Sequence, residues 1–205
     1  MTELIDLTHQ IHNDMPVYPV DDPVELDKTR SFDEDGYNYF RLTTGLHAGT
    51  HIDTPMHMTD DDTYMNEVPL DRFTGNGCVL DVRGQDTIEY KDEYSNMVNE
   101  NDIVLIYTGY DEKYGTEEYY TEHPLVDESL ADFFIEKKIK MLGMDIPTPD
   151  KEPFNIHKML FNNDILIIEN LTDLSELLSV DKFEIIAFPL KIKADSSIAR
   201  VIAKI

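Results

Sequence analysis

The segment Gly45–His57 (GLHAGTHIDTPMH) constrains the fold more than any other stretch, because three of the chain's seven histidines stand in it beside an aspartate. In a β-strand, side chains two residues apart point to the same face. A strand through this segment would therefore place His47, His51, Asp53 and His57 on one face. The pattern predicts a strand whose polar face carries a site.

A helix is the competing interpretation, since His47 and His51 are also four residues apart. Gly49, Thr50 and Pro55 disfavour a helix because each has a low helix propensity. The strand has a difficulty of its own: at about 3.3 Å per residue, the two histidines would lie roughly 13 Å apart. Gly49 permits a bulge or tight bend that shortens this span.

These residue types fit a metal site. Asp53 lies one pleat from His51 and can reach the same ion. Two imidazoles and a carboxylate that leave one position open for water match the ligands of catalytic zinc, manganese or iron sites. The alternative is a polar, turn-rich loop with surface histidines. Three histidines and an aspartate in one register favour the metal site.

Short apolar runs separated by turns indicate a strand-rich α/β domain. Several runs are nearly continuous in apolar residues, as in strands that are buried on both faces. The predicted strands are Leu4–Leu7, Tyr39–Thr43, Cys78–Val82, Ile103–Tyr107, Ile139–Met144, Ile165–Ile168, Glu184–Phe188 and Ile198–Ile202. Because no repeat, linker or shift in composition divides the chain, we expect one domain over residues 1–205 with a mixed sheet and few helices.

Helical periodicity is rarer than strand patterning in this sequence. It is clearest over Ser129–Lys138, where Leu130 and Phe134 share a face and lysines stand near the end. Two shorter helices are predicted at Ile156–Phe161 and Asp173–Leu178. Strands therefore outnumber helices in the expected α/β fold.

The charge excludes several classes of partner. Asp and Glu number 42 against 17 Lys and Arg, for a formal net charge of −25. DNA, RNA and anionic lipid all require clustered cations, so we expect neither nucleic acid nor membrane as a partner. No apolar run approaches the roughly 20 residues that span a bilayer. The start lacks a signal peptide and Cys78 is the only cysteine, which together favour the cytoplasm.

Other chemistries are not supported by the sequence. Gly45–Gly49 has the outline of a nucleophile elbow, but His47 stands in place of the serine. The acidic runs Asp33–Gly36 and Asp60–Asp62 lack the spacing of a calcium-binding EF-hand loop. Cys78 lies in an apolar run and is interpreted as inert core.

The pattern H-x-G-T-H-x-D-x-P-x-H, from His47 to His57, resembles the cyclase-like family of metal-dependent hydrolases, which includes bacterial kynurenine formamidases and isatin hydrolase. The resemblance implies the swivelling β/β/α fold of that family. It covers nearly the whole chain. Its further segments are Asp6–Thr8, Pro16–Pro19, Thr108–Gly109, Gly143–Pro147, His157, Ile168–Leu171, Pro189–Leu190 and Asp195–Ser196.

By this resemblance, a first divalent ion sits on His47, His51 and Asp53. Asp53 then bridges to a second ion held by His157 and Glu169. The resemblance gives one or two ions, with zinc or manganese as first choices. It also gives His57 the role of catalytic acid/base. From the residues alone, Glu169 needs a cation or donors because it follows a buried apolar run.

The substrate expectation also comes from the resemblance. Kynurenine formamidases carry a tryptophan that packs against the aromatic substrate, whereas this chain has no tryptophan and Tyr18 takes that place. Tyrosine can stack on a ring, so Tyr18 is the candidate substrate-binding residue. We expect a small-molecule amide, either an aryl formamide such as N-formylkynurenine or a cyclic amide.

The expected activity is hydrolysis of that amide by metal-activated water, with His57 moving the proton. One alternative is a metal-binding or regulatory protein of the same fold that lacks turnover; an intact His57 disfavours it. A closed structural zinc site is disfavoured by the open ligand set. Family members are commonly homodimers or homotetramers, and the same is expected here.

The remaining polar residues have plainer interpretations. His9, His12 and His123 lack partners at ligand spacing and are interpreted as structural or surface residues. For Asp145, a place beside the site and a purely structural role are both open.

Overall fold

Within residues 2–205, which the computed structural model describes, eight strands form one mixed sheet that closes on itself. The strands of the chain are β1 (Leu4–Asp6), β2 (Glu25–Arg30), β3 (Tyr39–Thr43), β4 (His51–Asp53), β5 (Thr74–Asp81), β6 (Thr87–Ile88), β7 (Ile103–Tyr107), β8 (Leu125–Val126), β9 (Met141–Met144), β10 (Leu166–Glu169), β11 (Glu184–Pro189) and β12 (Ser196–Lys204). The order in the main sheet is β1-β12-β11-β5-β7-β9-β10-β4.

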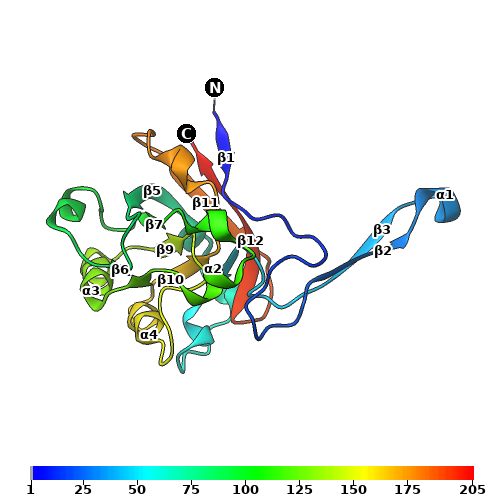
Figure 1. The fold of residues 1–205 in the computed structure, drawn as a ribbon, viewed down its shortest axis with the longest axis horizontal. Helices are drawn as coiled ribbons and strands as arrows, with labels where there is room; N and C mark the ends of the chain where they lie inside the picture. Colours follow the sequence, from blue (N-terminus) through cyan, green and yellow to red (C-terminus); the bar gives the residue numbers. More distant parts are fainter. Residues whose placement is uncertain (1) are drawn as a thin grey trace.

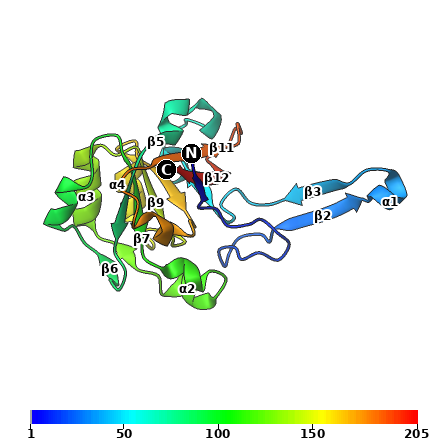
Figure 2. The same cartoon turned by 90° about the horizontal axis from the view of Figure 1, so that it is seen from above.

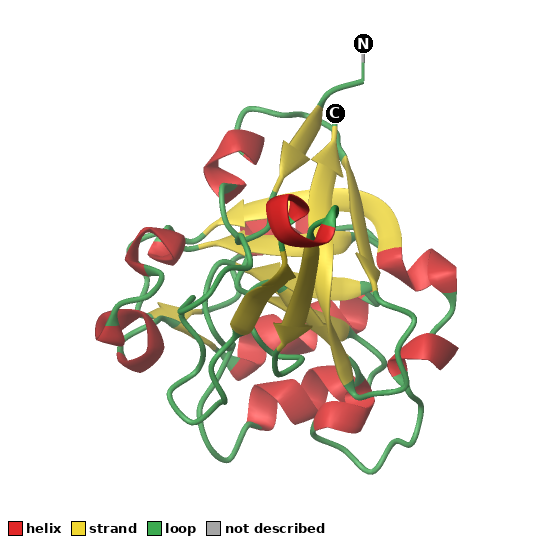
Figure 3. Cartoon of the chain, turned by 90° about the vertical axis from the view of Figure 1, so that its right-hand side faces the viewer, coloured by secondary structure: helices red, strands yellow, loops and turns green. Residues whose placement is uncertain are grey.

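Closure comes from β4, which pairs with β10 on one side and with β12 on the other. The pairs β5 with β7, β7 with β9 and β9 with β10 are parallel, while the remaining pairs of this sheet are antiparallel. Figure 3 shows the curved strands wrapping into a barrel-like sheet. The mixed, strand-rich α/β class predicted from the sequence is confirmed.

Helices are short and few. They are α1 (Phe32–Asp35), α2 (Glu117–Thr121), α3 (Glu128–Lys137) and α4 (Asn155–Phe161), with 3₁₀ turns at Pro55–His57, Met65–Glu67, Leu70–Phe73, Asp92–Asn96, Tyr110–Lys113 and Leu174–Leu177. The helices predicted at Ser129–Lys138 and Ile156–Phe161 are α3 and α4, each within one residue at its ends. Among residues 2–205, no helix has the length and apolar character needed to cross a bilayer.

The alternation of side chains along the central strands builds two cores. On β7, Val104 and Ile106 pack with α3 and α4 on the outside of the sheet, whereas Ile103 and Leu105 face the interior of the barrel. Both sets are fully buried, so the continuous apolar run of β7 reflects burial on two faces. Figure 1 shows α3 and α4 together beside this sheet.

A long arm leaves the body. Strands β2 and β3 pair with each other, carry α1 at their tip and extend away from the barrel (Figures 1 and 2). The predicted strand at Tyr39–Thr43 is therefore confirmed as β3, but it lies in the arm, and every residue of it is exposed.

Two predictions about local structure are wrong. Asp173–Leu178 is not an α-helix: Asp173 adopts a left-handed backbone (φ 57°) and only a 3₁₀ turn follows. The segment from His47 to His57 is not one strand either, because only His51–Asp53 are extended. Gly49 bends the chain before β4 with φ 63°. After β4, Pro55 opens a 3₁₀ turn that carries His57.

Candidate metal centre and its pocket

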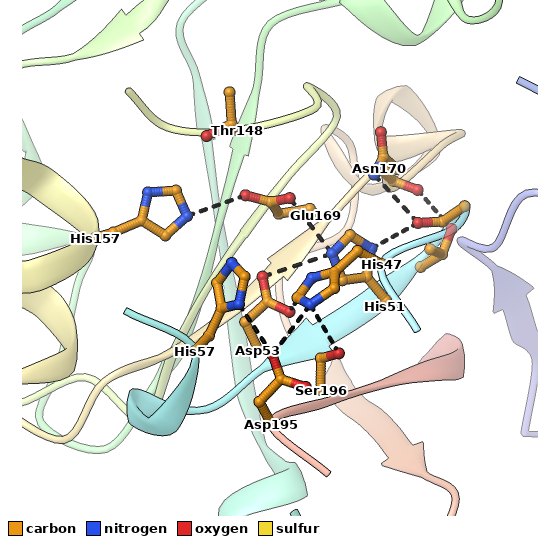
Figure 4. Close-up of polar contacts among 12 residues, drawn as sticks. His47, His51, Asp53, His57, Thr148, His157, Glu169, Asn170, Asp195 and Ser196 are labelled. Carbon is orange, nitrogen blue, oxygen red and sulfur yellow. Dashed lines mark hydrogen bonds and ion pairs between the residues drawn. The ribbon is translucent and has the colours of Figure 1, made fainter. Parts of the chain in front are cut away.

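The centre is built around β4 and its neighbour β10. His51 on β4 stands directly opposite Glu169 on β10 in an antiparallel pair, so the two side chains share a face. Nε2 of His51 lies 3.4 Å from Oε2 of Glu169 and 3.5 Å from Oδ2 of Asp53. All three side chains are buried. Figure 4 shows them converging with His47, His57 and His157.

The backbone fixes the orientation of His51. Nδ1 of its ring lies 2.8 Å from the carbonyl of Gly49, which requires that this nitrogen carries the proton and donates it. Asn170 Nδ2 donates to the same carbonyl at 3.1 Å. Because Nδ1 is occupied in this way, Nε2 presents its lone pair toward the two carboxylates.

His157 is oriented by a carboxylate. Its Nδ1 lies 2.6 Å from Oδ1 of Asp150, while Nε2 is 3.3 Å from Oε1 of Glu169. The other oxygen of Asp150 accepts from the backbone N–H of Ile156 at 2.6 Å, at the start of α4. Asp150 therefore anchors both the first turn of α4 and the ring of His157.

His47 and His57 share a second carboxylate, that of Asp195 just before β12. Nε2 of His47 lies 3.2 Å and Nδ1 of His57 lies 3.0 Å from Oδ2 of Asp195. The other nitrogen of His47, Nδ1, is 3.0 Å from Oδ1 of Asp53. The hydroxyl of Ser196 is 3.0 Å from Nε2 of His47. His47, which is partly exposed, thus contacts the buried carboxylate of Asp53.

Within residues 2–205, several polar atoms at the centre have no partner that meets hydrogen-bond geometry, although His47 approaches Asp53 closely. They are Nε2 of His51, both carboxylate oxygens of Asp53 and Oε1 of Glu169, all fully enclosed. Buried carboxylate oxygens left without donors are costly. Oxygen and imidazole lone pairs that point at one another are the arrangement that a divalent cation between them would satisfy. The donor set therefore fits a metal ion.

The pKa shifts of these side chains also indicate that the centre is stabilised by positive charge. Burial would lower the pKa of His51, but Asp53 and Glu169 raise it well above its ordinary value. Burial would raise the pKa of Asp53, yet His51 and His47 hold it well below its usual range. The pKa of His157 is raised to about 9, because its contacts with Asp150 and Glu169 outweigh burial. The buried carboxylates are thus ionised and take a cation, whether imidazolium or metal.

The predicted ligands are all brought together, but they group differently from the predicted sets. One compact group joins His51, Asp53 and Glu169, and a second joins His47, Asp53 and His57, with ligand atoms within 4.8 Å of one another in each. His157 is linked to the first group by Glu169, whose Oε1 lies 3.3 Å from Nε2 of His157. Asp53 belongs to both groups, and its bridging of two ions stays a prediction.

A pocket opens onto this centre. The cavity has a volume of about 160 Å³ and is open to solvent at its mouth. The polar side of its lining includes His47, His57, His157 and Glu169. The remaining walls are Pro16, Val17, Tyr18, Asp21, Gly49, Met58, Tyr114, Tyr120, Pro147, Thr148, Phe154 and Asn170. The predicted substrate-binding residue Tyr18 lies in this lining with 38% of its surface exposed.

Three supporting residues were missed by sequence reasoning: Asp150, Asn170 and Asp195. Asp195 occurs in a segment that carries the family resemblance, but nothing in its spacing assigns it a histidine partner. Asn170 accepts from the hydroxyl of Tyr119 at 2.9 Å and holds the Gly49 carbonyl. For Asp150, the only local signal is its place shortly before a helix.

The other polar residues lie apart from the ligand groups. Asp145 is buried and accepts from Thr108 and Gly109 at 2.7 to 3.1 Å, and burial raises its pKa to about 6. His9 stacks on Tyr114 with ring centroids 3.7 Å apart. His123 is buried, and its pKa is lowered to about 4 by burial.

Comparison with known proteins finds one family model and several similar proteins. Residues 5–151 match the Cyclase family ("Putative cyclase"). Kynurenine formamidase of Bacillus cereus is 29% identical over 208 residues, covering 99% of this chain and 98% of the relative. The same enzyme from Bacillus anthracis is 29% identical over 205 residues, with coverage of 98% and 96%.

Solved structures agree in fold. A potential metal-dependent hydrolase with cyclase activity superposes with a TM-score of 0.80 at 27% identity, covering 100% of this chain and 98% of the other. Isatin hydrolase A from Labrenzia aggregata, bound to benzyl benzoate, gives a TM-score of 0.88 at 23% identity, with coverage of 100% and 94%. At that identity the second likeness concerns the fold.

Proposed function

The chain belongs to the Cyclase family, and from this premise we propose that residues 1–205 act as one metal-dependent hydrolase domain that cleaves a C–N amide bond of a small molecule. The observation that carries the proposal is the set of enclosed, unpartnered atoms of His51, Asp53 and Glu169 beside a pocket. Relatives that are kynurenine formamidases support an amide as the substrate.

The ligands we propose follow the family pattern. His47, His51 and Asp53 would hold a first ion, and Asp53, His157 and Glu169 a second. Zinc or manganese suits this mixture of imidazole and carboxylate ligands. Bound there, such ions lower the pKa of a water and polarise a carbonyl group. The backbone carbonyl of Gly49 and the carboxylate of Asp150 hold two of the imidazoles in the ligating orientation.

His57 supplies the proton transfer in this proposal. Its Nδ1–H donates to Asp195, so Nε2 is left as a base. Nε2 takes a proton from the attacking water as the oxygen bonds to the amide carbon. As the C–N bond breaks, His57 returns that proton to the leaving nitrogen. An N-formyl aryl amine would yield formate and the free amine, and a cyclic amide would yield an amino acid.

The substrate we propose is an aryl formamide, such as N-formylkynurenine, or a cyclic amide. Tyr18, Tyr114, Tyr120 and Phe154 line the pocket and offer ring surfaces to a flat substrate.

Metal removal and refilling test the proposal. Purified protein is stripped with a chelator, checked by elemental analysis, refilled with zinc, manganese or cobalt, and assayed by ultraviolet absorbance on a panel of aryl formamides, lactams and lactones. Activity should disappear with the metal and return to different degrees. Turnover that survives verified absence of metal, or a metal-loaded protein inert on the whole panel, would overturn it.

We also propose that the protein is a cytoplasmic homodimer or homotetramer. The arm supports self-association, because large apolar side chains on it are exposed, among them Phe32 at 67% and Tyr39 at 57%. The lone Cys78 supports a reducing compartment. Light scattering gives the assembly size. An arm-trimmed variant joined across Glu25–Thr43 should become monomeric, and its remaining an oligomer would exclude the arm as the interface.

A further inference from the structure

The outer part of the pocket has its own chemistry. Tyr18 lies in the loop between β1 and β2, and Tyr120 lies on α2. Their rings meet edge to face with centroids 5.9 Å apart. Asp21 lines the same pocket, and its backbone N–H donates to the carbonyl of Tyr18 at 2.9 Å. Two aromatic rings and a carboxylate therefore stand together at the exposed rim.

This rim and the metal centre occupy different depths. Glu169 and His157 at the centre are buried, whereas Tyr18 is 38% exposed and Asp21 lies at the surface. A substrate whose amide reaches the histidines would thus extend its far end toward Tyr18, Tyr120 and Asp21.

Apart from histidines, the ionisable side chains that give the pocket lining its charge are acidic. Among the residues that line the pocket in the described chain, none is lysine or arginine, while Asp21 and Glu169 are acidic. The histidines there belong to the proposed ligand and acid/base sets. A carboxylate on the far end of a substrate would meet no cationic side chain and would face the Asp21 carboxylate. The net charge of −25 repels it further.

An ammonium group at the same place would be attracted. Aromatic faces attract cations through their quadrupole, and a neighbouring carboxylate adds a direct charge interaction. Burial raises the pKa of Tyr120, and Tyr114 and then Asp21 add to this effect, as expected of a carboxylate that lines the same pocket. The rim therefore offers an ammonium group both kinds of partner at once.

We propose that Tyr18, Tyr120 and Asp21 form a subsite for a protonated amine, and that the substrate is an aryl or cyclic amide with an ammonium group and no carboxylate at its far end. The proposal rests on the proposed amide hydrolysis and narrows it. N-formylkynurenine carries both charges, so its analogue with hydrogen in place of the carboxylate is the better substrate.

A matched set of substrates tests the charge preference. The set is N-formylkynurenine, its analogue without the carboxylate, its analogue without the amine, and the analogue lacking both. The metal-loaded protein should give a kcat/KM for the ammonium compound about tenfold above the neutral one, with the carboxylate compound slowest. Equal or faster turnover of the carboxylate compound would overturn the subsite.

Substitutions at Asp21 and Tyr18 test whether these residues cause the preference for an ammonium group. Asp21→Asn should reduce the ratio of kcat/KM for the ammonium compound to that for the neutral compound by about tenfold. Asp22→Asn, an adjacent exposed acid outside the pocket lining, is the control and should leave the ratio unchanged. Tyr18→Leu should lower the same ratio severalfold, whereas Tyr18→Phe keeps the ring and should preserve it. A ratio that is insensitive to Asp21 contradicts the proposal.

A binding measurement separates this subsite from catalysis. Calorimetric titration with 2-phenylethylammonium should show binding that Asp21→Asn weakens about tenfold, and phenylacetate should bind more weakly than the amine. If no amide is hydrolysed but this binding pattern holds, the proposed function fails and the subsite stands. If hydrolysis is seen and the amine does not bind, the subsite fails alone.

Discussion

Nδ1 of His57 lies 3.0 Å from Oδ2 of Asp195, although 138 residues separate the two in sequence. The contact exists because β12 pairs with β4 and brings the residue before Ser196 beside the turn after Asp53. Burial would raise the pKa of Asp195, but its contacts with His57 and His47 lower it. Asp195 thus remains an acceptor that fixes which nitrogen of His57 faces the pocket.

Replacing His57 by alanine distinguishes an acid/base from a ligand. We expect near-normal metal content and a fall in kcat of about 10²–10⁴-fold, the range for a positioned proton-transfer group. Elemental analysis and steady-state kinetics measure the two quantities. His57 stands in a compact group with His47 and Asp53, so loss of metal in this variant would instead make it a ligand.

The substitution Asp195→Ala should lower activity because the imidazole of His57 loses the carboxylate that orients it. We expect kcat to fall about 10–100-fold with little change in KM, as for other residues that orient a functional imidazole. Asp195→Glu should recover part of the loss because it restores an acceptor. Asp60→Ala, an exposed acid just after the same turn, is the control. An unchanged kcat in Asp195→Ala would remove Asp195 from the catalytic arrangement.

Asp53→Asn should disturb both proposed ions together. Asp53 is shared by the two compact donor groups, and an amide has neither the charge nor the second anionic oxygen of a carboxylate. Metal content by elemental analysis should therefore fall for both ions. Loss of only one equivalent would show that Asp53 does not bridge.

Cys78 should be inert in the folded protein. Burial raises the pKa of its thiol to about 12, with Asp102 adding to the effect. At pH 8 the thiol is therefore protonated in the native state, while in the unfolded chain it titrates near its ordinary value. A disulfide reagent such as Ellman's should react with one equivalent per chain only after denaturation. Rapid reaction of native protein would contradict the burial of this thiol.

Sequence patterning determined the elements that depend on local composition. The strand at Ile103–Tyr107 has the predicted limits, because a short continuous apolar run is typical of a strand that is buried on both faces of a sheet. Helix α3 was equally readable, since its apolar face and the lysines near its end are local signals, whereas its N-cap, Asp127, was identified only in the structure. The clustering of His47, His51, Asp53 and His57 also followed from spacing, although their placement in one strand did not hold.

Tertiary structure determined the contacts between segments that are distant in sequence. Gly49 and Pro55 confine the strand to His51–Asp53, so His47 and His57 reach the centre from flanking turns. Asp195 and Asp150 take their histidine partners through strand closure and the start of α4. Sequence spacing specifies which side chains are close only within one element. Contacts across elements depend on how the sheet closes, which is a property of the whole core.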